Sequence, residues 1–341
     1  MELNLEKFKA VYIDDNVNNL MLLEAFCQEI GLDIKCFEYP KEGVDYILNN
    51  DIDILFTDYM MPEMNGVEVI EKIRNESNDT IIVMITAAGE DYDLKIQALE
   101  SGATDFLTKP VDFLEFQVRV KNLLKLKDKA LLLQDEVREA TKTIIQREQE
   151  TLAVLGKAAE YKDPETGSHI VRVAHYSKLL SEKLGKDTKF IDTIFYAAPL
   201  HDIGKIGISD NILLKPAKLS DEEFEVMKTH STLGVNMLVN SQNRYLKMGA
   251  EIAYGHHEKF NGSGYPRGIA GEEIPLSARI VAVADVFDAL TSVRPYKKAW
   301  GFDKAIELLY EESGKHFDPS LVELFILNIT YVKEIYKKYQ E

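Results

Sequence analysis

The second half of the chain gathers its chemically active side chains into a few short motifs. All seven histidines follow residue 160, and five of them lie in the motifs ETGSH, LHDIGKIG, KTH and HHEKFNGSGYP. One histidine on a helix is more often structural than a ligand, but five histidines with nearby acids predict a metal centre. Mixed imidazole and carboxylate sets suit Mn²⁺, Fe or Zn²⁺, and two such ions about 3.5 to 4 Å apart form a clamp used in phosphoester hydrolysis.

The spacing within these motifs assigns the ligands to common faces. Glu165 and His169 are four residues apart, which places them on one face if a helix has begun at Glu165. His201 and Asp202 are adjacent, so one can bind a single ion while the carboxylate bridges two. Adjacent residues at a helix end point about 100° apart, so paired histidines can each face a different ion.

The elements around these motifs are helical by pattern. Helices are predicted at 171–184, 190–203, 221–240, 244–257, 277–292 and 302–312. An all-α domain builds metal sites from side chains on facing helices. Lys205 follows His201 by four residues on the same predicted face and can approach a phosphate, and Asp285 is a further candidate acid. His175 and His316 match no ligand position and are interpreted as structural.

The first third of the chain predicts a different fold. Short β-rich runs recur between helical patterns at 9–15, 33–39, 51–58, 80–87 and 103–110, which is typical of a doubly wound, five-stranded parallel α/β sheet. Ligands of such sheets gather beyond the carboxyl ends of the strands. Three carboxylates, a hydroxyl and an ammonium stand there: Asp14, Asp15, Asp58, Thr86 and Lys109. This set suits Mg²⁺ and a phosphoryl group, which a carboxylate can accept.

A long helix is predicted between the two regions. Residues 113–160 contain no proline, and no glycine before Gly156, and are rich in strong helix formers. Apolar residues recur at alternating spacings of three and four from Leu123 to Ile144 and then falter. Such a seam indicates either a dimeric coiled coil or a helix packed on its own domain, and we favour a homodimer.

Composition narrows the class of protein. The net charge of −17 argues against DNA held by bulk electrostatics, since that binding needs a basic face. Two cysteines, Cys27 and Cys36, are too few for a disulfide framework, and no apolar run approaches the roughly 20 residues of a membrane span. We therefore expect a cytoplasmic protein with no membrane insertion.

The motifs VYIDDN, LFTDYMMPEMNG, MITA and FLTKP make residues 1–125 resemble the flavodoxin-like receiver domain of two-component response regulators. The resemblance implies that Asp58 is the phosphoacceptor and that a sensor histidine kinase is the partner. It implies Mg²⁺ bound by Asp14, Asp15, Asp58 and the main-chain carbonyl of Met60. Thr86 and Lys109 would contact the phosphoryl group.

After a helical linker at 126–150, residues 151–341 resemble an HD-GYP domain, the cyclic di-GMP phosphodiesterase branch of the HD superfamily. The resemblance runs through ETGSH, LHDIGKIG, KPAKLSDEEF, HHEKFNGSGYPRG, ARIVAVADVFDALTSVRPYK and KHFDP. It implies catalytic roles for His201, Asp202 and Lys205. The implied metal ligands are Glu165, His169, His201, Asp202, His230, His256, His257 and Asp285. The implied substrate contacts are Lys205, Gly264, Tyr265, Pro266, Arg294 and Lys297.

The resemblance predicts hydrolysis of cyclic di-GMP to pGpG, with further hydrolysis to GMP left open. Two or three divalent ions, Fe or Mn, would serve as cofactors, together with Mg²⁺ in the receiver domain. The alternative is a catalytically weak adaptor that binds cyclic di-GMP or a diguanylate cyclase. Another cyclic dinucleotide or a phosphomonoester stays open as the substrate, because the HD metal site alone is not selective. The family more often has Trp and Asp where this chain has Phe260 and Asn261.

Overall fold

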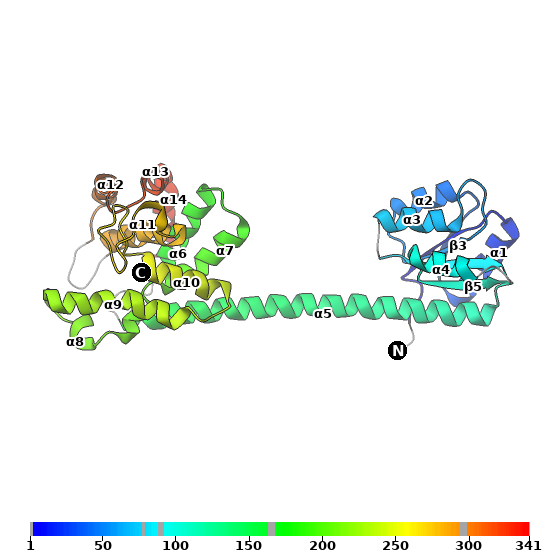
Figure 1. Ribbon diagram of the computed structural model, residues 1–341, viewed down its shortest axis with the longest axis horizontal. Helices are drawn as coiled ribbons and strands as arrows, with labels where there is room; N and C mark the ends of the chain where they lie inside the picture. The colour runs from blue at the N-terminus through cyan, green and yellow to red at the C-terminus, as the bar shows by residue number, and fades with distance from the viewer. Residues whose placement is uncertain (1–2, 77–78, 88–91, 163–167, 293–298, 341) are drawn as a thin grey trace. The chain divides into compact units, whose positions relative to one another are not determined.

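The computed structural model describes residues 3–76, 79–87, 92–162, 168–292 and 299–340 (Figure 1). The chain divides into two compact units between Ala140 and Thr141. This boundary falls inside the segment 126–150 that the sequence predicts as a linker, and the three predicted domain ranges stay predictions.

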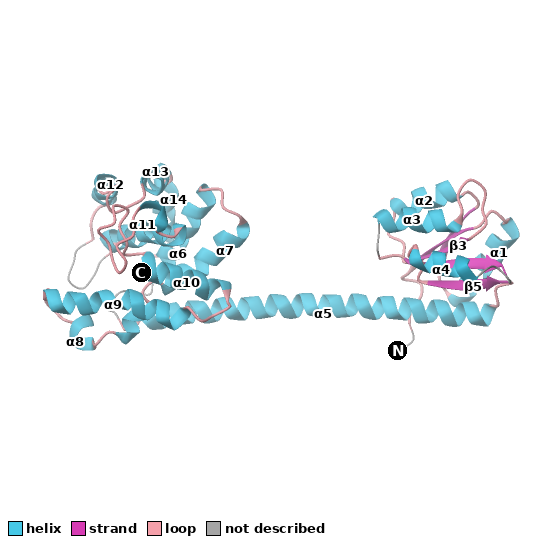
Figure 2. Ribbon diagram, viewed as in Figure 1, coloured by secondary structure: helices cyan, strands magenta, loops and turns pink. Residues whose placement is uncertain are grey.

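The first unit is built on a parallel sheet, as the sequence predicts (Figure 2). Its strands are β1 (Lys9–Ile13), β2 (Asp33–Phe37), β3 (Ile54–Asp58), β4 (Ile81–Ala87) and β5 (Asp105–Lys109), in the order β2-β1-β3-β4-β5. Strands β1, β3 and β4 consist almost wholly of buried residues, because helices cover both faces of the sheet. The predicted doubly wound α/β fold is confirmed.

Helices pack on both faces of this sheet. One face is covered by α2 (Pro40–Leu48), α3 (Gly66–Glu76) and α4 (Tyr92–Glu100), whose apolar residues join the core around Val11 and Leu55. The other is covered by α1 (Val17–Ile30) and by the first turns of α5 (Phe113–Glu160), through Leu23 and Phe116. The candidate acids Asp14 and Asp58 lie buried at the carboxyl ends of β1 and β3.

Helix α5 is continuous over 48 residues, as its composition predicts. Many apolar residues along the predicted seam are exposed, among them Leu126, Leu133, Val137 and Ile144, each with more than half of its surface accessible. Among described residues, the middle of this helix therefore lacks an apolar cover.

The second unit is all-helical in its described parts. After α5 it contains α6 (Ser168–Lys183), α7 (Thr188–Ala197), α8 (Asp210–Leu213), α9 (Asp221–Leu238), α10 (Arg244–Gly255), α11 (Leu276–Thr291), α12 (Phe302–Glu311), α13 (Pro319–Leu327) and α14 (Ile329–Lys338). Helix α11 forms the centre of its core, where Val281, Phe287 and their neighbours are fully buried. The sequence prediction of an all-α domain is confirmed.

One predicted helix is wrong in its second half. The segment 190–203 leaves the α-helix at Ala197 and continues as two short 3₁₀ turns, η1 (Ala198–Leu200) and η2 (Ile203–Gly207). Pro199 has no backbone N–H to donate, so the helical ladder is interrupted there. His201 and Asp202 therefore lie at the junction of two tight turns.

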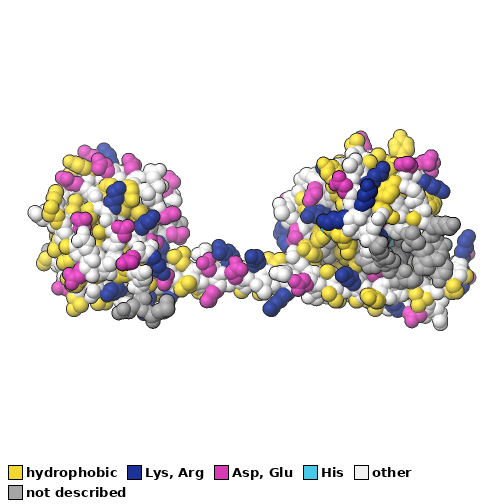
Figure 3. All heavy atoms as spheres, turned by 180° about the vertical axis from the view of Figure 1, so that it is seen from behind, with side chains coloured by type: hydrophobic (Ala, Val, Ile, Leu, Met, Phe, Trp, Pro, Cys, Tyr) yellow, Lys and Arg dark blue, Asp and Glu magenta, His cyan; other side chains and the backbone are white. Residues whose placement is uncertain are grey.

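The surface mixes charges of both signs. On the side shown in Figure 3, lysine and arginine side chains alternate with aspartate and glutamate, and no single basic face gathers them. Across the described residues, no helix is both long enough and apolar enough to cross a membrane.

Candidate metal centres

The first centre lies at the carboxyl ends of β1 and β3. Oxygen atoms of Asp14, Asp15 and Asp58 lie within 4.8 Å of one another. Lys109, at the end of β5, places its Nζ 2.6 Å from Asp58 Oδ1 and 2.9 Å from Asp14 Oδ2. The sheet thus brings together the acids and the ammonium that the sequence predicts for a phosphoryl site.

The Asp14 carboxylate is surrounded by donors. Tyr12 donates its hydroxyl to Asp14 Oδ2, the Asn16 amide donates to Oδ1 at 2.8 Å, and the Asn19 side chain lies 3.0 Å from both oxygens. Tyr12 and Asn19 were missed by the sequence analysis, although Tyr12 lies two residues before Asp14 on the same face of a strand. These bonds fix the orientation of Asp14 before any cation binds.

The Asp58 side chain lies in a pocket shaped by the backbone. Burial raises its pKa, and Lys109 opposes part of that rise. A Cβ on Gly66 would lie 2.4 Å from the Asp58 carbonyl oxygen, so glycine is required where α3 starts. Met60 follows two residues after Asp58 with an exposed side chain, and Thr86 is buried at the end of β4. The contacts implied for Met60 and Thr86 stay predictions.

The second centre is assembled from five elements of the helical unit. Its candidate ligands form two groups, each with ligand atoms within 4.8 Å of one another. The first group contains His169, which lies on α6, Asp285, which lies on α11, and His201. The second group contains His230, which lies on α9, and Asp202, His256 and His257. All seven described members of the predicted ligand set therefore converge. Glu165 lies outside the described residues, as do Arg294 and Lys297.

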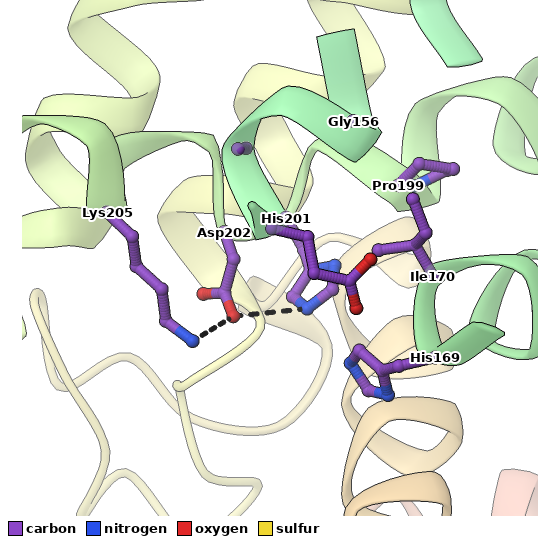
Figure 4. A pocket seen from close by; sticks show the side chains of 9 residues that line it. Gly156, His169, Ile170, Pro199, His201, Asp202 and Lys205 are labelled. Carbon is purple, nitrogen blue, oxygen red and sulfur yellow. Dashed lines mark ion pairs between the residues drawn. The ribbon is translucent and has the colours of Figure 1, made fainter. Parts of the chain in front are cut away.

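Asp202 joins the two groups. Its Oδ1 lies 3.3 Å from His230 Nε2 and 3.5 Å from His256 Nε2. Its Oδ2 lies 3.4 Å from His201 Nε2 and 2.7 Å from Lys205 Nζ (Figure 4). Burial raises the pKa of Asp202, but Lys205 and His201 lower it more, so its pKa lies well below the usual range. Asp202 is thus an ionised carboxylate at the centre of the cluster.

Backbone carbonyls orient three of the histidine rings. The Nδ1 atoms of His201, His230 and His256 lie 2.9, 2.8 and 3.0 Å from carbonyl oxygens of their own helical turns. Each Nδ1 therefore carries the proton, which leaves Nε2 as the ligand atom facing the cluster. The Nε2 atoms of His201 and His256 and Oδ1 of Asp202 are buried and accept no hydrogen bond from the described residues. Such converging acceptors fit divalent cations.

Two acids at this centre were missed by the sequence analysis. Asp288 lies one turn after Asp285 on α11. Its Oδ2 forms a hydrogen bond with His169 Nδ1 at 2.8 Å, and its Oδ1 forms an ion pair with Arg172 Nε at 2.7 Å. A carboxylate behind a ligating histidine fixes the ring and raises its basicity. Glu160, the last residue of α5, lines a pocket together with His169, His201, Asp202 and Lys205. The three-residue spacing from Asp285 to Asp288 could have revealed Asp288 in the sequence. No sequence pattern indicates Glu160, because only the folding of the chain places it in this pocket.

Close backbone packing explains the glycines beside the ligands. A Cβ on Gly204 would lie 1.9 Å from the His230 carbonyl oxygen, so η2 can meet α9 only with glycine at this position. A Cβ on Gly264 would lie 2.2 Å from the Lys259 amide nitrogen. Tyr265 and Pro266 lie in the same loop. The Tyr265 amide donates to the carbonyl oxygen of His257, just after the end of α10.

Comparison with known proteins agrees with this architecture. The family models for the response regulator receiver domain and the HD domain match residues 10–121 and 143–321. The chain is 40% identical over 336 residues to "Cyclic di-GMP phosphodiesterase response regulator RpfG" of Xanthomonas campestris pv. campestris, covering 95% of this chain and 89% of that protein.

Two further relatives differ in the cyclic dinucleotide that their names give. A "Cyclic di-GMP phosphodiesterase" of Thermotoga maritima is 39% identical over 305 residues, covering 85% of this chain and 83% of the relative. "3'3'-cGAMP-specific phosphodiesterase 2" of Vibrio cholerae is 42% identical over 191 residues, covering 56% of this chain and 35% of the relative. With both domains matched and the first relative covered almost throughout, the chain belongs to the family of response regulators that carry a receiver domain followed by an HD domain.

Proposed function

We propose that this response regulator hydrolyses cyclic di-GMP to pGpG at a site of two or three divalent cations, Fe or Mn, and that phosphorylation of Asp58 controls the reaction. The observation that carries the proposal is the convergence of seven histidine and aspartate ligands on two adjacent groups joined by Asp202. Relatives named cyclic di-GMP phosphodiesterases, one of them a response regulator, supply the substrate class.

Each group would hold one cation. His169, His201 and Asp285 would bind the first, and the group of Asp202, His230, His256 and His257 the second, with Glu165 proposed for a third. Bound cations supply Lewis-acid stabilisation of the phosphoryl charge and activation of water. The protein contributes preset ligands, because the Nδ1 hydrogen bonds hold the rings before binding.

Lys205 is proposed to stabilise charge on the substrate phosphate. Its ammonium lies 2.7 Å from Asp202 at the edge of the cluster, where a phosphoryl oxygen would approach. Hydrolysis breaks one P–O3′ bond and adds a water oxygen to phosphorus, and the released O3′ takes a proton. Arg294 and Lys297 are proposed to contact the phosphate groups, with Gly264 and Pro266 shaping the neighbouring loop.

The receiver unit is proposed to accept phosphate from a sensor histidine kinase onto Asp58, with Mg²⁺ bound by Asp14, Asp15, Asp58 and Met60. We further propose a homodimer through α5, since apolar side chains along its predicted seam are exposed. A second subunit would cover Leu126, Leu133 and Val137 with identical residues.

A second substrate merits a direct test, because a relative named as specific for 3'3'-cGAMP is 42% identical over 191 residues. The metal ligands alone would not discriminate between the two cyclic dinucleotides, since both contain the same phosphodiester linkage. Competition between them measures the specificity of the surrounding loops.

The decisive experiment couples metal analysis to chromatography of products. Purified protein loaded with Mn²⁺, or anaerobically with Fe²⁺, is incubated with cyclic di-GMP, with 3'3'-cGAMP, and with both. We expect pGpG to appear with cyclic di-GMP and to be lost in His201→Ala, while exposed Tyr310→Leu keeps activity. Two bound metals without turnover of either substrate, even after phosphorylation, would replace the enzyme by a binding adaptor.

A further inference from the structure

Four neighbouring histidines of the cluster, one from the first group and three from the second, are held in different ways. His201, His230 and His256 each have Nδ1 bonded to a backbone carbonyl at 2.8 to 3.0 Å. In the described ranges the His257 side chain makes ring contacts with His256 and Tyr265 but no side-chain hydrogen bond. An imidazole without such a bond can rotate about its side-chain torsions, which would weaken a metal ligand.

The Tyr265 ring supplies the missing restraint. It is stacked on the His257 ring with centroids 4.7 Å apart and planes 26° from parallel. The His256 ring lies 3.9 Å from His257 on a tilted plane, so the imidazole is enclosed by two rings. The Tyr265 amide also donates to the His257 carbonyl oxygen at 3.2 Å, which ties the two residues at the backbone.

The loop that carries Tyr265 is fixed by its own contacts. Glu258, with 2% of its surface exposed, accepts hydrogen bonds from the amides of Arg267 at 2.7 Å and Gly268 at 3.0 Å. The Phe260 amide donates to the His316 carbonyl at 3.0 Å. A buried carboxylate and main-chain hydrogen bonds therefore fix the path of this loop, although several of its side chains are exposed.

Two further side chains approach the Tyr265 ring. The Lys228 ammonium lies 5.6 Å from its centroid, and the Phe224 ring meets it edge-on at 6.5 Å. Burial raises the pKa of its hydroxyl group, which agrees with an enclosed ring. A ring engaged by His257, Lys228 and Phe224 is poorly placed to receive a guanine base.

We infer that Tyr265 is a positioning residue that holds the His257 imidazole toward the cation site by stacking, in place of the hydrogen bond that orients the other rings. This inference rests on the proposed metal centre and gives Tyr265 this role in place of the substrate contact that the family resemblance implies. It assigns Gly264 a matching part, since a Cβ at this position would lie 2.2 Å from the Lys259 amide nitrogen and would displace the loop that carries Tyr265.

The test measures Mn²⁺ affinity by competition with a chelator, without nucleotide. Tyr265→Leu should weaken Mn²⁺ binding by about 10- to 100-fold at one site, the usual size of an outer-shell effect. Tyr265→Phe keeps the ring and should bind as the wild type does. Tyr310→Leu, at an exposed position of α12, is the matched control. At saturating Mn²⁺, Tyr265→Leu should lower kcat with KM unchanged.

A double-mutant cycle separates positioning from general damage to the fold. If Tyr265 acts through His257, adding Tyr265→Leu to His257→Ala should cause no further loss of Mn²⁺ affinity. Additive losses would overturn the inference, as would a Tyr265→Leu protein with normal Mn²⁺ affinity and a raised KM, which is the result expected of a base-stacking platform. A wild type that binds Mn²⁺ but hydrolyses no cyclic dinucleotide would refute the proposed function and leave this inference intact.

Discussion

The buried acids of the two centres differ in the partners that balance their charge. In the receiver unit, Asp14 and Asp58 already have a cationic partner in Lys109, and Tyr12 and Asn19 donate to Asp14. In the helical unit, imidazole nitrogens and carboxylate oxygens face one another, and Lys205 reaches only the edge of the cluster.

This difference predicts different roles for the cations. A pocket with its own ammonium folds as a complete site and can exchange Mg²⁺ during signalling. A cluster of converging acceptors is destabilised until a cation binds, so the binding free energy becomes part of the folding free energy. The comparison holds if metal removal damages only the helical unit.

The largest effect is expected for Asp202→Ala. The carboxylate lies 3.3 to 3.5 Å from the Nε2 atoms of His201, His230 and His256, so its loss removes a ligand from the second group and the contact that joins this group to His201 of the first. We expect metal content to fall and phosphodiesterase activity to drop by at least about 100-fold. Exposed Asp303→Ala on α12 serves as the control. A fully metallated and active Asp202→Ala protein would show that Asp202 does not join the groups.

Chelation should separate the two units in stability. The only tryptophan, Trp300, lies in the helical unit, so its fluorescence reports unfolding there. Loading with Mn²⁺ at about 100 times its dissociation constant should raise the unfolding free energy of this unit by about 2.7 kcal/mol relative to chelated protein. Hydrogen exchange of β1 and β3 should change little with Mg²⁺. Equal effects in both units would break the comparison.

Asp58→Asn tests the receiver centre. The amide cannot accept a phosphoryl group and loses the 2.6 Å ion pair with Lys109. We expect acetyl phosphate to change neither turnover nor oligomeric state in this variant, while the Mn²⁺ content of the helical unit stays that of the wild type. Exposed Asp51→Asn in the same unit is the control. A response that survives in Asp58→Asn would place the phosphoacceptor elsewhere.

Sequence patterns predicted the features that depend on local spacing. The five strands and their acids were found because buried strands read as apolar runs that end in polar residues. The ligand motifs were found because each joins histidine to an acid or a second histidine over a few residues. The gathering of histidines and acids predicted a metal centre, and the individual ligand set came from the family resemblance.

Features that depend on contacts between distant segments were not predicted. His169 and Asp288 are 119 residues apart in sequence, and Glu160 enters the pocket only through the packing of α5. The tight turn at His201 follows from Pro199, which interrupts the hydrogen bonds of the α-helix. The apolar pattern of this segment still resembles a continuous helix, so the interruption was not predicted. The path of the loop that carries Tyr265 depends on Glu258, which accepts hydrogen bonds from two amides of that loop. In the sequence alone Glu258 looks like an ordinary charged side chain.

The smallest predicted effect concerns the pH dependence of stability, which should also differ between the two units. All seven histidines follow residue 160, so histidine titration can change stability only in the helical unit. The His175 ring stacks on Tyr339 at 4.5 Å and meets Phe195 at 5.0 Å. Burial, assisted by Lys178 and Lys338, lowers its pKa from 6.5 to about 4.

The sign follows from linkage. Between these two pKa values the unfolded chain binds a proton that the folded protein does not, so stability is full above the unfolded value and falls as pH decreases toward 4. Between about pH 7 and pH 5, allowing for partial exposure of the ring, His175 should cost about 1 kcal/mol. His175→Phe keeps the stacking and should remove that loss in denaturant unfolding followed by Trp300, whereas Tyr310→Phe should not. An unchanged pH slope in His175→Phe would mean that other groups of the helical unit carry its acid sensitivity.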